Sequence, residues 1–175
     1  MEASGVLHPD ERVELIDGEI ITMAAKTPRH DDMCAAIVKA LARRLPDNVD
    51  FTMEPAFRLS EHWEPEPDII FYPDHLRPSQ VRGNTVLLVV EVAVSSLSID
   101  LTIKAAMYAA HGVREYWVVD AKRLITHVHR EPGPEGYGSV RQFAASDSLR
   151  PLLLPAMALP LADLGFEPLA DSEGA

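Results

Sequence analysis

VLLVVEVAV, residues 86–94, is the most apolar run of the chain, and it contains one charged residue, Glu91. A short run of valine and leucine without alternating polar residues predicts a central β-strand that is buried on both faces. A carboxylate in such a strand is destabilising unless it is paired, protonated or bound to a metal ion. Glu91 is therefore the first candidate for a functional residue.

Two further polar residues are placed to join Glu91. Asp68 opens a second apolar strand, residues 69–72, and Lys104 lies near the start of a helix that we expect from Asp100, as its N-cap, to residue 111. Side chains of matching parity on adjacent strands stand side by side on one face of a sheet. Two carboxylates so placed can hold Mg²⁺, and a neighbouring lysine can stabilise the negative charge that develops in phosphodiester cleavage.

Each of these residues also has a purely structural interpretation, and the sequence leaves it open. Glu91 can form an internal ion pair, with Lys104 as its natural partner, and Asp68 can be an acid in a turn at the end of a strand. Lys104 can be an ordinary surface lysine. On the predicted helix, Lys104, Tyr108 and His111 recur at i, i+4 and i+7, so they form one stripe that we expect to border the cleft.

The composition sets limits on the class of protein. A chain of 175 residues with a hydrophobic content of 47% predicts one globular domain, which we place at residues 1–170, followed by a disordered tail at 171–175. No apolar run approaches the ~20 residues that span a membrane, and we expect no secretory signal. The one cysteine, Cys34, is typical of a reducing cytoplasm and is expected to be a small buried side chain.

The net charge of −11 argues against nonspecific affinity for nucleic acid, because polyanions are usually held by lysine and arginine. A metal ion would offset acidic charge locally, and some basic residues do cluster. They follow one predicted helix: Arg29, Lys39, Arg43 and Arg44. An ordinary solvated helix face explains the same cluster.

The wider pattern predicts an α/β fold, a mixed β-sheet flanked by few helices. Residues 12–23 surround an Asp-Gly pair and predict a β-hairpin. Pro28 opens a helix that extends to about Leu45. The remaining strands are expected at 49–59, 68–72, 86–94, 115–120, 123–130 and 138–143. A single helix separates the strands at 86–94 and 115–120, which indicates a right-handed βαβ unit.

The order and spacing of these motifs resemble the Uma2 (Uma-two) family of restriction endonucleases, within the PD-(D/E)XK nuclease superfamily. The similar stretches are Glu14–Glu19, Pro28–His30, Pro67–Asp68, Leu88–Val92, Asp100–Lys104 and Tyr108–Asp120. The resemblance extends over about residues 12–165. It implies a restriction-endonuclease-like core and hydrolysis of DNA that depends on Mg²⁺ or Mn²⁺. The alternative is a catalytically inactive nuclease-like module for binding or assembly.

The resemblance also implies roles for single residues. Asp68 and Glu91 match the two acids that hold the metal ion, and Val92 is counted with them as a ligand. The family's lysine is expected on the following helix, where Lys104 matches it, because the more usual position for a lysine in the superfamily is occupied by Ala93.

Three further residues are implied as part of the catalytic set. Tyr108 matches a residue that recurs beside the helical lysine, and Glu19 and His30 fall where the family tends to carry an acid and a histidine. His30 is placed to contact a phosphate, although a histidine at a helix start is more often a surface or capping residue. The chain departs from the family at Val94–Ser96, which lacks the proline of a Ser-Pro-Ser type turn.

Two weaker patterns remain. Apolar residues near the end of the chain, Leu152–Leu154, Met157 and Leu159, can pack on the core or on a second copy, so a homodimer is a further expectation. His127 and His129 alternate on one predicted strand, and such a pair can bind Zn²⁺. Since no cysteine or third histidine is near in sequence, an exposed edge strand is favoured.

Overall fold

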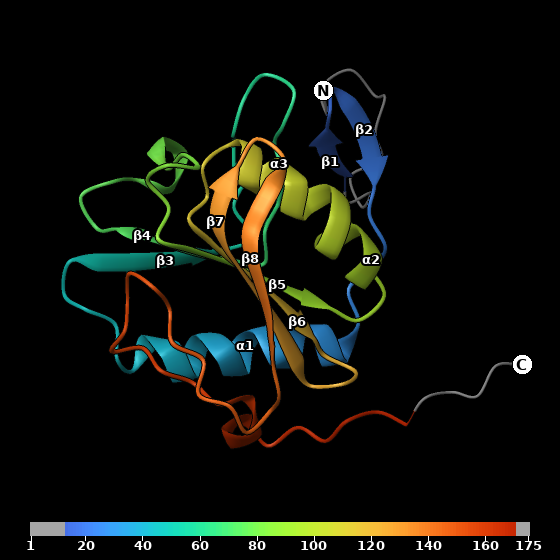
Figure 1. The fold of residues 1–175 in the computed structure, drawn as a ribbon, viewed down its shortest axis with the longest axis vertical. Helices are drawn as coiled ribbons and strands as arrows, with labels where there is room; N and C mark the ends of the chain where they lie inside the picture. The colour runs from blue at the N-terminus through green and yellow to red at the C-terminus, as the bar shows by residue number, and fades with distance from the viewer. Residues whose placement is uncertain (1–12, 171–175) are drawn as a thin grey trace, which may run out of the picture.

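The computed structural model describes residues 13–170, which form a six-stranded mixed β-sheet and a separate two-stranded hairpin (Figure 1). Arg12, expected in the hairpin, and the predicted tail at 171–175 lie outside the described residues. The strands of the large sheet follow one another in chain order: β3 (Val49–Met53), β4 (Ile69–Pro73), β5 (Leu88–Ala93), β6 (Glu115–Asp120), β7 (Ile125–Gly133) and β8 (Gly136–Phe143).

β5 and β6 are the centre of the sheet and its only parallel pair among the described strands. All six residues of each strand are buried. The helical connection between them confirms the predicted βαβ unit, and the sheet with its N-terminal hairpin confirms the predicted α/β fold class. Because side chains alternate along a strand, each face of this pair contributes to a different core.

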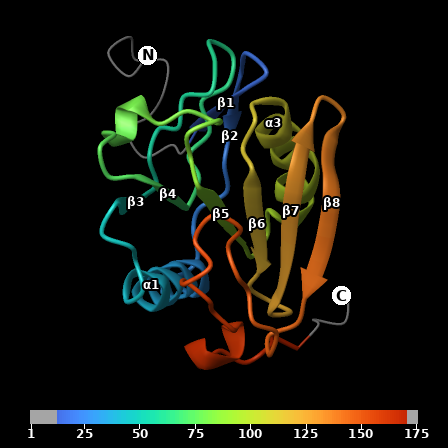
Figure 2. The ribbon, with the colours of Figure 1, turned by 60° about the vertical axis from the view of Figure 1, so that its left-hand side comes forward.

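α1 (Pro28–Ala42) and α3 (Ala105–Ala110) lie on opposite faces of the sheet (Figures 1 and 2), and each packs on one of the two cores. On one face, Val90 and Val92 pack with α1, whose buried residues recur at helical spacing. On the other face, Val89 packs beneath α3. Because of this alternation, the side chain of Glu91 faces α3. The rest of its strand is apolar, as the sequence predicts.

The helical connection differs from its prediction at the start. It begins with a short turn, α2 (Leu97–Ile99), continues through the π-helical segment η3 (Asp100–Lys104) and ends in α3. Asp100 is therefore inside the helix and is not its N-cap. Its carboxylate is buried and accepts a hydrogen bond from the Ser96 hydroxyl, which lies at the true helix start. π-Helical turns occur frequently at functional sites.

Other boundaries shift for local reasons. β3 ends at Met53 because Glu54 has a positive φ of 52° and Pro55 follows. In the hairpin, β1 (Val13–Ile16) and β2 (Glu19–Thr22) pair antiparallel around the expected Asp-Gly turn. Short 3-10 turns complete the described chain: η2 (Pro78–Gln80) and η4 (Leu161–Leu164).

The strand that carries the two histidines is not an edge strand, so that expectation is wrong. β8 pairs with β7 and is itself an edge strand of the sheet. His129 is buried and contacts the rings of Tyr116 and Tyr137. Near the end of the chain, Met157 packs in the α1 core while Leu152 is exposed, and self-association stays a prediction. Within residues 13–170, no helix has the length and apolar character needed to cross a membrane.

The start of β6 generates a stability prediction. Glu115 is fully buried and accepts hydrogen bonds from Arg130 (2.6 and 2.9 Å) and Trp117 Nε1 (2.9 Å). Arg130→Met leaves this carboxylate without its cation, so we expect the free energy of unfolding to fall by about 2–4 kcal/mol in urea titrations.

The matched control is Arg123→Met, which removes a pair with Asp120 at 3.3 Å in which the Arg123 side chain is 55% exposed. Asp120 is buried, but it also accepts hydrogen bonds from the backbone N–H groups of Lys122 and Arg123, so we expect a loss below about 1 kcal/mol when the exposed Arg123 side chain is removed. Equal losses in the two variants would show that burial of the arginine does not govern the effect.

Candidate active site

Asp68 and Glu91 lie next to each other where β4 and β5 pair. The antiparallel register places Ile69 opposite Val90, and its continuation brings Asp68 opposite Glu91. The backbone N–H of Asp68 donates to Glu91 Oε2 at 3.3 Å, and the N–H of Val92 donates to Asp68 Oδ2 at 2.8 Å. Both carboxylates are buried. The two acids therefore occupy one end of the strand pair.

Lys104 is a buried lysine at the centre of a cluster of acids. Its Nζ lies 3.0 Å from Glu91 Oε1, 3.0 Å from Glu14 Oε1 and 3.9 Å from Asp100 Oδ1. Burial lowers the pKa of Lys104, but the negative charges around it outweigh this effect and raise the pKa above its usual value. The lysine is charged at neutral pH, and its burial excludes the surface-lysine interpretation.

The environment of Glu91 disfavours its ionisation. Burial raises its pKa well above the usual value, the charge of Lys104 opposes that rise, and the charge of Asp68 adds to it. The Tyr108 hydroxyl donates a further hydrogen bond to Glu91 Oε1 at 3.2 Å. The described site has more acidic than basic side chains. A bound divalent cation would offset the excess negative charge.

Asp68 contacts cations on the side away from Glu91. Its Oδ1 lies 3.0 Å from His30 Nε2 and 3.1 Å from Lys26 Nζ. Burial opposes ionisation of Asp68, but the hydrogen bond and charge of His30 outweigh it and lower the pKa of Asp68 to about 2. Burial lowers the pKa of His30 in turn, and its contacts with Asp68 and Asp31 together more than reverse this. Thr27, the N-cap of α1, accepts a hydrogen bond from the His30 N–H and fixes this end of the helix.

The hairpin contributes a different acid from the one expected. Glu14 on β1 is buried against Lys104, whereas Glu19 is exposed beside the turn and does not line the cleft. Glu14 and Ile16 are the buried positions of β1, so a charged residue in the buried parity is the signal that indicates Glu14. Lys26 was also missed, because a loop residue carries no pattern that predicts its contact.

One cleft brings most of these side chains together. The lining of the cleft includes these polar residues: Glu14, Lys26, His30, Glu66, Asp68, Glu91, Ser95, Ser96, Asp100 and Lys104. Tyr108 is not part of the lining but donates a hydrogen bond to Glu91. Among residues 13–170, Glu14 Oε2 is a buried oxygen without a hydrogen-bond partner. Hard cations such as Mg²⁺ and Mn²⁺ prefer oxygen ligands, so the carboxylates here fit such an ion.

Comparison with known proteins gives a family and a fold. A family model described as "Uma2: Putative restriction endonuclease" matches residues 1–162. A crystal structure described as a putative nuclease belonging to DUF820 from Anabaena variabilis is similar with a TM-score of 0.74 and 15% sequence identity. The match covers 93% of this chain and 94% of that chain. At this identity the similarity shows a shared fold. A search of curated proteins gives no match.

The lysine cluster generates a second stability prediction. Lys104→Met leaves three buried acids around an apolar side chain, so we expect the free energy of unfolding in metal-free buffer to fall by about 3–5 kcal/mol. The control is Lys39→Met on the exposed side of α1, which we expect to change stability by less than about 0.5 kcal/mol. Urea unfolding of both variants gives the comparison. A Lys104→Met protein as stable as wild type would mean that the acids do not depend on this cation.

Proposed function

The chain belongs to the Uma2 family, described as putative restriction endonucleases, and from this premise we propose that it is a metal-dependent endonuclease that hydrolyses DNA. The observation that carries the proposal is the contact of Asp68 with Glu91 at one end of β4 and β5, with Lys104 Nζ 3.0 Å from Glu91. Two carboxylates and one ammonium group in a shared cleft are the groups that phosphodiester cleavage requires.

Asp68, Glu91 and Val92 are the residues that would hold Mg²⁺ or Mn²⁺. When bound, such a cation supplies Lewis-acid chemistry and lowers the pKa of a water ligand. Asp68 enters the site ionised, since its pKa is about 2. Glu91 is held in place by Lys104 and Tyr108, so its carboxylate faces the cleft in a fixed orientation.

The positive groups of the cleft are suited to a phosphate. Lys104 is charged, and Glu14 and Asp100 hold its ammonium beside Glu91, where it stabilises negative charge on a transferring phosphoryl group. His30, with its raised pKa, is a donor for a phosphate oxygen at the cleft wall. In this proposal Glu14 is a positioning residue, in the part of the site where the family resemblance implies Glu19.

A specific observation favours the alternative, a nuclease-like module without catalysis. The oxygens of Asp68 accept contacts from Val92, His30 and Lys26. Glu91 Oε1 is likewise engaged by Lys104 and Tyr108. A network in which Asp68 and Glu91 are already paired with internal cations can serve as a structural ion cluster.

One experiment separates the two functions. We expect 100-fold excess of Mn²⁺ over its Kd to stabilise the wild-type protein by about 2.7 kcal/mol, because a ligand that binds only the folded state stabilises it by mass action. Glu91→Gln, which removes a proposed ligand, should lose this response and lower cleavage of plasmid DNA by about 10²–10³-fold. Melting temperatures in EDTA and in Mn²⁺, together with gel assays, measure both effects.

The control is Glu61→Gln, a neutralised acid on the exposed surface, which should keep both the Mn²⁺ response and the cleavage. If the melting temperature of the wild type is the same in EDTA and in Mn²⁺, as it is for Glu91→Gln, and no DNA is cut, the endonuclease proposal fails. The inactive module is then the better account.

A further inference from the structure

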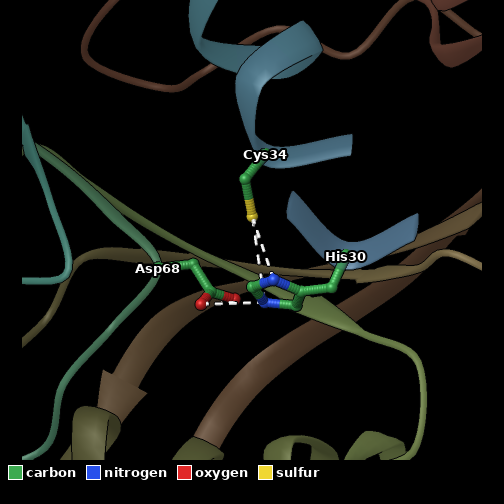
Figure 3. A group of neighbouring side chains, drawn as sticks. All are labelled: His30, Cys34 and Asp68. Carbon is green, nitrogen blue, oxygen red and sulfur yellow. Dashed lines mark hydrogen bonds and ion pairs between the residues drawn. The ribbon is translucent and has the colours of Figure 1, made fainter. Parts of the chain in front are cut away.

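A sulfur, a nitrogen and an oxygen converge on the side of Asp68 that faces α1 (Figure 3). His30 Nε2 lies 3.0 Å from Asp68 Oδ1, and Cys34 Sγ lies 3.8 Å from His30 Nε2. The ligand atoms of all three residues lie within 4.8 Å of one another. His30 and Cys34 are one helical turn apart on α1, so the helix itself presents both side chains to Asp68.

This donor set differs from the oxygen ligands on the other side of Asp68. Thiolate and imidazole ligands suit Zn²⁺ and related ions, whereas Mg²⁺ takes oxygen ligands. Zn–N and Zn–S bonds of about 2.1 and 2.3 Å at a tetrahedral angle separate the two ligand atoms by about 3.6 Å. The Sγ–Nε2 distance of 3.8 Å is near this value, but Sγ also lies 3.9 Å from Nδ1, so the His30 ring or the Cys34 side chain must rotate for Nε2 and Sγ to share one ion. Three protein ligands leave a fourth position for water.

We propose that His30, Cys34 and Asp68 form a binding site for a zinc-class divalent cation, which adjoins the Mg²⁺ site of the proposed function and has Asp68 in common with it. His30 and Asp68 line the cleft, which gives an ion a route to the buried Cys34. Burial raises the pKa of the Cys34 thiol and so favours its neutral form. Coordination displaces its proton, and that of His30 Nε2, to solvent.

The two sites share Asp68, and this has a functional consequence that rests on the proposed function. A zinc-class ion on Asp68 Oδ1 withdraws a carboxylate from the Mg²⁺ site and places a second divalent charge beside it. Lys26 must leave this oxygen, and Glu54, 2.8 Å from Lys26 Nζ, remains as its partner. Zinc-class ions are therefore inhibitors of Mg²⁺-dependent cleavage, with Cys34 as the ligand that selects them.

Cobalt(II), a spectroscopic substitute for zinc, tests the site independently of catalysis. Titration of Co²⁺ into the full chain should give a thiolate-to-cobalt charge-transfer band that Zn²⁺ abolishes. Cys34→Ser and Cys34→Ala should both lose the band and weaken Zn²⁺ binding about 100-fold. Glu91→Gln keeps all three ligands and should retain the band. Melting curves of the two Cys34 variants serve as the control that each variant is folded.

The cleavage assay gives a second readout. Zn²⁺ added to a reaction with Mg²⁺ should inhibit the wild type at concentrations about 100-fold lower than those that inhibit Cys34→Ser. A missing band in the wild type, or equal Zn²⁺ affinity in the wild type and a folded Cys34→Ser, overturns the zinc site. A Cys34-dependent band without any Mg²⁺-dependent cleavage supports the site and rejects the proposed function instead.

Discussion

The ion cluster around Lys104 is the interaction on which the rest of the site depends. One buried ammonium group contacts acids from the hairpin, from the central strand and from the π-helical segment. The hairpin is not part of the large sheet, and its backbone bonds to the loop before β4, through the bridge between Leu15 and Glu64 and the Gly18 N–H that donates to the His62 carbonyl. The contact of Glu14 with Lys104 thus helps to hold the hairpin over the cleft. Removing the cation would affect both the charge balance and the position of this element.

The alternation of side chains along β5 explains why the lysine can come from a helix. Glu91 and Ala93 point to the same face of the strand, the face covered by α3, while Val92 points into the α1 core. A lysine at position 93 and a lysine on the covering helix therefore approach the same side of Glu91. The small Ala93 packs in the α3 core, and the ammonium group reaches the acid from above. What matters is that an ammonium group reaches the space above Glu91, and more than one backbone position can supply it.

Local patterns predicted the residues whose environment is fixed by their own strand. The burial of Glu91 and its proximity to Asp68 follow from two apolar strands and the pleat. Glu14 and Lys104 are 90 residues apart, and no local pattern shows which face of a four-residue strand will dock. Asp100 was misread for a related reason, since an acid before an apolar helical stretch is usually a cap. Its burial depends on tertiary packing.

Asp68 shows how one carboxylate can serve two kinds of chemistry. Its Oδ2 faces β5 and the oxygen-rich cluster, while its Oδ1 faces the imidazole of His30 and, beyond it, the thiol of Cys34. Lys26 and His30 pair with this acid, and Lys104 pairs with Glu91. Any metal ion therefore competes with charges that the fold already provides, and its net affinity is the difference between two electrostatic states. The endonuclease and the inactive module therefore differ in how strongly the cluster binds a metal ion. The same residues are compatible with both.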